Sequence, residues 1–247
     1  MRLALVSDIH GNLLALQAVL QDIQRRGVAQ IINLGDSLSG PLWPRETGEF
    51  LMRQTWPQLM GNHDRQVLHF DPRSQEASDR YAAQQITPEI LHWLGSLPPT
   101  LWLTPQVFLC HGTPRDDLQY FLESVDAQGA RLATAAEIGE RLSGIAAKLV
   151  ACGHTHTARA AKTADGTLIV NPGSVGQPAY ADGDPYDHKV ESGSPDARYA
   201  IVEEIDGGWR ANLLSVPYDH AAAAKLAYTN GRPDWGYALT HGYVASG

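Results

Sequence analysis

Five short segments of this 247-residue chain each place metal-binding side chains at the end of a short apolar run. The segments are Asp8-Ile9-His10, Gly35-Asp36, Gly61-Asn62-His63-Asp64, His111-Gly112 and Gly153-His154-Thr155-His156. Each offers a carboxylate, an amide oxygen or an imidazole, which are ligands that small divalent ions take from proteins. One such motif alone is common. Five in one chain indicate strands whose ends meet at a single metal site.

The spacing inside two of the segments supports this interpretation. Asp8 and His10 are two residues apart, and so are His154 and His156. In an extended backbone, side chains two residues apart project to the same side of the strand. Each pair is therefore predicted to reach one ion from an extended segment.

The first part of the chain alternates between strand and helix patterns. Residues 2–7 and 29–34 are predicted to be buried strands, and apolar residues recur at helical spacing from Leu13 to Ile23 between them. Such a β-α-β unit normally makes a parallel pair of strands. Further helices are predicted through residues 50–52, over 74–94 in two pieces, and over 134–147, 219–228 and 235–239.

Hairpin patterns dominate the later part of the chain. Asp165-Gly166 lies between two strand patterns and is a strong hairpin signal. Strands are predicted at 58–60, 101–103, 107–110, 149–152, 159–162, 167–170, 198–205 and 209–216. Residues 176–197 are predicted to be a long polar loop, and residues 218–247 a C-terminal helical segment. The simplest organisation is an α/β fold with a single domain over residues 1–247.

Composition and charge exclude several classes of function. The formal net charge of −8 argues against an extended nucleic-acid surface, which needs a basic face. No apolar run approaches membrane-spanning length, and residues 1–7 do not resemble a signal peptide, so a cytoplasmic location is expected. Cys110 and Cys152 are predicted to be small buried residues. Two divalent ions would outweigh the charges of Asp8 and Asp36, so an anionic substrate still fits.

The order of the five motifs resembles that of the calcineurin-like metallophosphoesterase superfamily. The stretches at residues 7–12 (Ser-Asp-Ile-His-Gly-Asn) and 171–176 (Asn-Pro-Gly-Ser-Val-Gly) are similar to its small bacterial and archaeal phosphodiesterase branch, and the resemblance spans residues 1 to about 205. It implies a four-layer α/β/β/α sandwich of two mixed sheets flanked by helices, with a dimetal site at one edge.

The resemblance also implies a role for each motif residue. Asp8, His10 and His156 would bind one ion, Asn62, His111 and His154 the other, and Asp36 would bridge both. A metal-bridging hydroxide would attack phosphorus in line. The ligand set suits Mn²⁺, iron, Zn²⁺ or Ni²⁺ and does not select among them.

Three further residues take roles outside the ligand set. His63 resembles the family's catalytic histidine, which stabilises the transition state or protonates the leaving oxygen. Asp64 would orient His63 from behind. Asn12 occupies a position where the family often places a substrate-facing residue.

The implied function is hydrolysis of small phosphoesters, with phosphodiester or nucleotide-type substrates favoured. The alternative is a non-catalytic protein-interaction scaffold, as in the retromer subunit that resembles this fold, and it is disfavoured because His63 and every ligand are present. A nuclease would need a basic surface. The segment 176–197, which contains His188, either overhangs the site and shapes substrate choice or is a disordered surface loop. For Arg65, Arg115 and Tyr180, surface placement is favoured over substrate contact.

Overall fold

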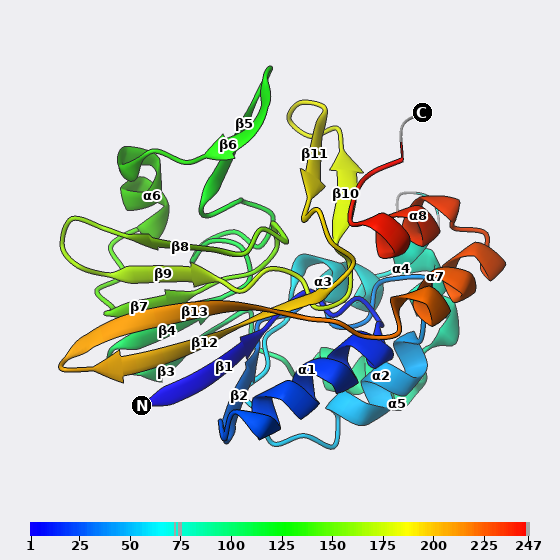
Figure 1. Cartoon of the computed structure of the whole chain (residues 1–247), viewed down its shortest axis with the longest axis horizontal. Helices are drawn as coiled ribbons and strands as arrows, with labels where there is room; N and C mark the ends of the chain where they lie inside the picture. Colours follow the sequence, from blue (N-terminus) through cyan, green and yellow to red (C-terminus); the bar gives the residue numbers. More distant parts are fainter. Residues whose placement is uncertain (72, 74–75, 246–247) are drawn as a thin grey trace.

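The computed structural model describes residues 1–71, 73 and 76–245. It has the predicted α/β architecture, in which two mixed sheets lie among helices (Figure 1). The four-stranded sheet has the order β13-β12-β1-β2, with β1 at Arg2–Val6, β2 at Gln30–Asn33, β12 at Ala197–Ile205 and β13 at Gly208–Val216. The five-stranded sheet has the order β3-β4-β7-β9-β8, with β3 at Thr100–Thr104, β4 at Val107–Cys110, β7 at Leu149–Ala151, β8 at Arg159–Lys162 and β9 at Leu168–Asn171.

The two sheets share one apolar core. Alternate residues of each strand point to opposite faces. Leu5 of β1 and Leu109 of β4 belong to the core between the sheets. Val6 of β1 instead packs in a cluster with α1 (Leu13–Arg25), while Val150 of β7 packs in a cluster with α6 (Ala135–Leu142). Each sheet therefore buries one face against the other sheet and the opposite face against a helix.

Parallel pairing brings the ends of the motif-bearing strands together. β1 pairs in parallel with β2, and β7 pairs in parallel with both β4 and β9. Asp8, Asp36, His111 and His154 follow β1, β2, β4 and β7 within three residues. The carboxyl ends of parallel strands are where open α/β sheets place their sites. Four of the five motifs follow strands that meet at one edge, as predicted, whereas Gly61-Asn62-His63-Asp64 follows an isolated bridge at Gln58.

The remaining helices lie around this edge, as Figure 1 shows. They are α2 (Pro44–Leu51), α3 (Asn62–Leu68), α4 (Ala77–Gln85), α5 (Pro88–Leu94), α7 (His220–Thr229) and α8 (Pro233–His241). α4 and α5 are the two predicted pieces of residues 74–94, of which 74–75 lie outside the described residues. α6 is shorter than predicted because Ser143 and Gly144 take left-handed backbone conformations, with φ of 55° and 80°, that end it at Leu142.

Two hairpins correct the sequence-based expectations. The segment predicted to be a long polar loop contains the antiparallel strands β10 (Ala179–Asp182) and β11 (His188–Glu191). In β11 only His188 and Val190 are buried, so this polar segment is a strand with one buried and one exposed face. A second, unpredicted hairpin joins β5 (Glu123–Asp126) and β6 (Gly129–Leu132). Residues 58–60 form a single bridge to Asn33 instead of the predicted strand.

Within the described part of the chain, none of the helices combines the length and apolar character needed to cross a membrane.

Candidate metal centre

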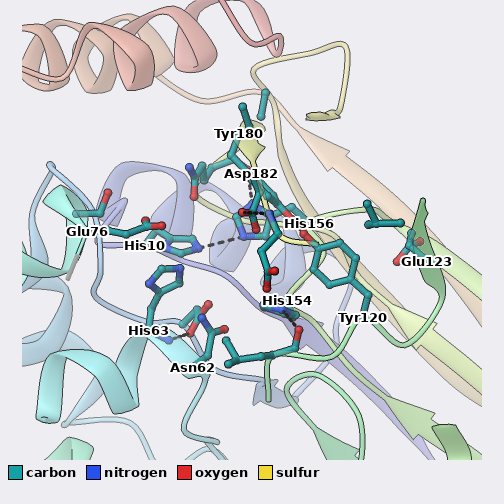
Figure 2. A pocket seen from close by; sticks show the side chains of 18 of the residues that line it. His10, Asn62, His63, Glu76, Tyr120, Glu123, His154, His156, Tyr180 and Asp182 are labelled. Atoms are coloured by element: carbon teal, nitrogen blue, oxygen red, sulfur yellow. Dashed lines mark hydrogen bonds between the residues drawn. The ribbon is translucent and has the colours of Figure 1, made fainter. Parts of the chain in front are cut away.

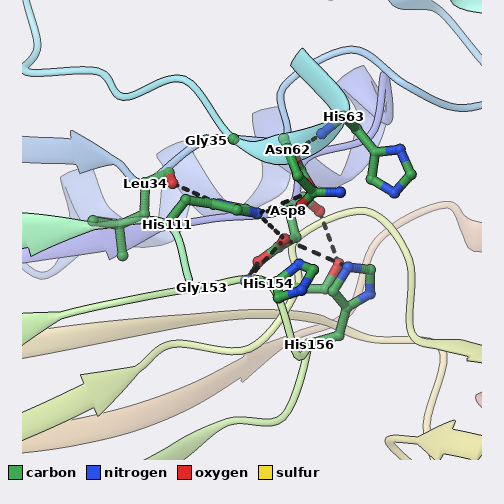
Figure 3. A network of polar contacts seen from close by, with 12 residues as sticks. Asp8, Leu34, Gly35, Asn62, His63, His111, Gly153, His154 and His156 are labelled. Atoms are coloured by element: carbon green, nitrogen blue, oxygen red, sulfur yellow. Dashed lines mark hydrogen bonds and ion pairs between the residues drawn. The ribbon is translucent and has the colours of Figure 1, made fainter. Parts of the chain in front are cut away.

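The motif residues form two adjacent buried clusters at the strand ends. The first contains Asp8, His10 and His156, and the second contains Asp36, His111 and His154. In each cluster the candidate ligand atoms lie within 4.8 Å of one another. His111 Nε2 lies 3.2 Å from Asp36 Oδ2 and 3.9 Å from Asp8 Oδ1, so the clusters touch (Figure 3). The resemblance implies the same division of the histidines, with Asn62 added to the second cluster and Asp36 shared by both.

Each of the four candidate ligand histidines directs one ring nitrogen toward the clusters and donates a hydrogen bond from the other nitrogen to a backbone carbonyl. His10 Nδ1 donates to Ser39 O at 2.6 Å, and His156 Nδ1 donates to Gln177 O at 2.9 Å. His111 and His154 likewise bond at 2.9 Å to the carbonyls of Leu34 and Leu118. In a neutral ring such an outer bond fixes the tautomer and leaves the inner nitrogen available to a metal.

In the first cluster the inward atoms are acceptors that face each other, since His10 Nε2 lies 3.1 Å from His156 Nε2. Lone pairs at this separation repel unless a cation lies between them, and burial makes the cost larger. In the second cluster one end of the Asn62 amide lies 3.0 Å from His111 Nε2, 2.9 Å from His154 Nδ1 and 3.2 Å from Asp36 Oδ2. An NH2 group in this place donates to its neighbours in the ion-free protein, and an amide oxygen there is available to an ion. The donor set fits divalent ions at both clusters.

Burial and nearby charge set the protonation of the histidines in the ion-free protein. Burial lowers the pKa of His10 to about 3 and that of His154 to about 4, so both stay neutral, the form that binds a metal. Burial also acts to lower the pKa of His111, but the Asp36 carboxylate outweighs it and raises the value to about 9.

The backbone at the ligands is not extended, which corrects the expected geometry. Asp8 and His10 have φ of 54° and 50°, and His154 and His156 have φ of 71° and 54°. Asp36 is also left-handed, with φ of 55°. Each pair still converges, but through left-handed residues beyond the strand end, a conformation that L-residues seldom adopt.

The comparisons with known proteins decide the family. Residues 1–188, about three quarters of the chain, match the calcineurin-like phosphoesterase superfamily domain. The chain belongs to the calcineurin-like phosphoesterase superfamily. It is 28% identical over 249 residues to an uncharacterised protein of Methanocaldococcus jannaschii, which covers 94% of both chains.

Two solved structures of the same overall extent are similar to this phosphoesterase-family chain. A metallophosphoesterase from Sphaerobacter thermophilus matches with a TM-score of 0.74 at 27% identity, covering 98% of this chain and 99% of the other. A hypothetical protein from Pyrococcus horikoshii matches with a TM-score of 0.75 at 19% identity over 99% of both chains, a likeness of fold.

His63, at the position of the family's histidine, differs from the four candidate ligand histidines in its hydrogen-bond partner. His63 Nδ1 donates to a carboxylate, Asp79 Oδ1, at 2.9 Å, whereas the four ligand rings bond to carbonyls. Its ring is 22% exposed, and it meets the His10 ring edge-on at 5.5 Å between centroids. Burial acts to lower the pKa of His63, but Asp36 and Asp79 outweigh it and raise the value to about 10.

Asp64 does not contact the His63 ring in the way the resemblance implies. Its carboxylate accepts from the backbone N–H groups of Ser37 at 2.9 Å and Gly61 at 3.1 Å, so it caps α3 from the N3 position. Burial and the Asp36 charge raise its pKa to about 7. The residue that orients His63 is Asp79 of α4, which lies 16 positions away and carries no local motif that could have revealed it.

Asn12 is structural rather than substrate-facing, which corrects its expected role. It is fully buried at the N-cap of α1, where its Oδ1 accepts from Ala15 N at 3.2 Å. Its Nδ2 donates to Gly176 O and to the Tyr218 hydroxyl, both at 3.0 Å. All of its hydrogen-bonding capacity is directed into the protein, and it ties the first motif to the C-terminal part of the chain.

A cavity of about 710 Å³ opens over the two clusters. This volume lies within the range of small-molecule sites. His63 and Glu76 line one side, and Tyr120, Tyr180 and Asp182 line another, as Figure 2 shows. Tyr180, for which surface placement was favoured, thus belongs to the cavity wall. Arg65 instead forms a bidentate pair with Asp117, at 2.7 and 2.8 Å.

Proposed function

We propose that the protein hydrolyses small phosphoesters, of the phosphodiester or nucleotide type, at a pair of divalent ions. The observation that carries this proposal is the convergence of two buried histidine and aspartate clusters, in the first of which two imidazole nitrogens face each other as acceptors. The inward nitrogens of His10 and His156 lie 3.1 Å apart, and the Asn62 amide lies about as close to two further histidines. Membership of the superfamily supports the same chemistry.

The residues divide between two ions. Asp8, His10 and His156 would hold one ion, Asn62, His111 and His154 the other, with Asp36 shared between them. When bound, the ions would supply Lewis acidity that neutralises phosphate charge and lowers the pKa of water from 15.7 to about 7. Mn²⁺, iron, Zn²⁺ and Ni²⁺ all suit this ligand set.

His63 is the proposed acid of the reaction. Asp79 fixes its Nδ1, so Nε2 is the nitrogen that remains to give a proton to the leaving oxygen. The two carboxylates that raise its pKa keep the ring protonated at neutral pH. General acid catalysis by a positioned side chain contributes roughly 10²- to 10⁴-fold to a rate.

The test combines metal analysis with hydrolysis assays. Protein purified from medium supplemented with Mn²⁺ should carry close to two ions per chain and hydrolyse bis(p-nitrophenyl) phosphate. Asp36→Asn should lose metal and activity together, whereas Asp206→Asn, in the turn between β12 and β13, should lose neither. A wild-type protein with neither metal nor activity would refute the proposal and favour the interaction scaffold.

A further inference from the structure

A chain of hydrogen bonds fastens the β10–β11 hairpin beside the two clusters. The hydroxyl oxygens of Tyr180 and Tyr120 lie 2.7 Å apart, and Tyr120 Oη lies 3.0 Å from His188 Nε2. His188 Nδ1 in turn bonds to the carbonyl oxygen of Tyr186 at 2.8 Å. His188 itself is 5% exposed, so this chain is shielded from water at its inner end.

The carbonyl at one end gives this chain a direction. A carbonyl only accepts, so His188 donates from Nδ1, and in the tautomer that leaves Nε2 without a proton the ring accepts there. Tyr120 then gives its only proton to His188, and Tyr180 gives its only proton to Tyr120. In the described chain no other donor is directed at the Tyr180 hydroxyl, whose lone pairs therefore remain for a ligand.

These tyrosines lie against the candidate metal ligands. The Tyr180 ring meets the His156 ring edge-on, with centroids 4.9 Å apart, and the Tyr120 ring meets the His154 ring at 5.1 Å. Both tyrosines line the cavity, and Figure 2 shows Tyr180 and Asp182 together at its edge. An acceptor on Tyr180 is thus close to the first cluster, within reach of a ligand in the same cavity.

The charged groups of this wall favour the same kind of ligand. Asp182 is exposed, and the contact recorded for its carboxylate in the described chain is the backbone N–H of Asp184 at 3.1 Å. The arginines among the described lining residues are already engaged. Arg131 pairs with Asp126 and Glu137, Arg141 bonds to two carbonyls and Ser124, and Arg232 pairs with Asp234 and Ser78. Additional phosphates would have to compete with these contacts for the arginines.

We propose that the substrate carries one phosphoryl group, on an alcohol rich in hydrogen-bond donors, and that Tyr180 and Asp182 bind those donors. The donors are hydroxyl or ammonium groups, as in polyols, ribose or amino alcohols. This inference rests on the proposed phosphoesterase function and names the substrate class of that site. It makes Tyr180 and Asp182 specificity-determining residues, since they touch the alcohol and not the reacting phosphorus.

The test compares three phosphodiesters on the Mn²⁺-loaded protein. A diglycerol diester offers hydroxyl donors, a diethanolamine diester offers ammonium donors, and bis(p-nitrophenyl) phosphate offers none. Tyr180→Phe should lower kcat/KM for the glycerol diester, relative to the nitrophenyl diester, by about five- to tenfold. Because the lost contact is made to a non-reacting part of the substrate, the loss should appear in KM rather than kcat.

A matched control uses the same chemical change on the same hairpin. Tyr186 is 50% exposed and lies outside the cavity lining, and its carbonyl would remain in Tyr186→Phe. This variant should keep the wild-type selectivity ratio. A ratio that also stays constant in Tyr180→Phe would overturn the proposal, as would a glycerol diester that the wild type fails to cleave while it cleaves the nitrophenyl diester.

A second variant separates the two kinds of donor and does not depend on the tyrosine. Asp182→Asn removes the charge but keeps an oxygen acceptor, so selectivity for the ethanolamine diester should fall more than selectivity for the glycerol diester. If the selectivity for each diester is the same in wild type and in Asp182→Asn, Asp182 does not bind the substrate. A wild type that cleaves none of the three esters would instead refute the proposed function itself.

Discussion

The carboxylate behind His63 provides the sharpest test of the mechanism. Asp79 is 1% exposed, and its Oδ1 lies 2.9 Å from His63 Nδ1. In Asp79→Asn an amide oxygen can still accept this bond, but the charge is lost. The variant therefore perturbs the electrostatics of His63 while changing the shape of the site little.

The expected size of the effect follows from the bond. A hydrogen bond to a charged partner contributes about 1.5–3 kcal/mol, and one pKa unit corresponds to about 1.36 kcal/mol. Removing the charge should thus lower the pKa of His63 by roughly one to two units. In the ion-free protein the starting value is about 10, and ions that share Asp36 would offset part of the contribution from that carboxylate.

The sign of the pH effect is fixed by the role of the ring. A protonated acid is active below its pKa and inactive above it, so activity falls as pH rises through the pKa of His63. In Asp79→Asn the alkaline limb of kcat/KM should move to lower pH by about one to two units, with little change on the acid side. NMR titration of the His63 ring in the ion-free variant should show a fall in the same direction.

Asp206→Asn, made at an exposed turn, serves as the control and should leave the limb in place. The reasoning is refuted if Asp79→Asn leaves the alkaline limb where it is, or moves it upward. A displaced acid limb would mean that His63 acts in its neutral form, as a base.

Further variants test the role of His63, the close packing of Gly61 against Asp36, and a buried hydrogen bond of Tyr199. His63→Ala should reduce kcat by roughly 10²- to 10⁴-fold with metal content unchanged in elemental analysis, while His92→Ala, at an exposed position of α5, should keep full activity. A loss of metal in His63→Ala would contradict its separation from the ligands. Gly61→Ala should lose metal because the new Cβ would lie 2.5 Å from the Asp36 backbone nitrogen, whereas Gly139→Ala meets nothing within 4 Å and should retain both ions. Tyr199→Phe removes a 2.7 Å bond to Asp22 and should lower the free energy of unfolding by about 1–2 kcal/mol in urea titrations, and an unchanged midpoint would count against that bond.

The clustering of the candidate ligands could be predicted because each motif is local. Each motif follows an apolar run, and the runs become strands or a bridge that end at one edge of the sheets. The pairing of β1 with β2 followed from the strand-helix-strand pattern alone. The sequence therefore placed Asp8 and Asp36 at neighbouring strand ends before any distance was known.

The rest of the site depends on contacts that no local pattern reports. Asp79 reaches His63 from a different helix, and Tyr120 reaches Tyr180 across 60 positions. Asn12 matched a family position, yet its side chain hydrogen-bonds to three groups inside the protein. A motif match could not reveal that the side chain points away from the cavity. The β10–β11 hairpin was missed because its strands are short and its exposed face is polar.

The left-handed backbone of the ligands has an evolutionary consequence. Asp8, His10, Asp36, His154 and His156 are five of the seven non-glycine residues with positive φ in the described chain. The left-handed backbone costs most L-residues about 1–2 kcal/mol, so selection on stability alone would replace His10, His154 and His156. Without selection for bound ions, glycine or asparagine would be expected at these positions. A relative that keeps histidine at these positions would therefore be under continued selection for metal binding, even where no activity has been measured.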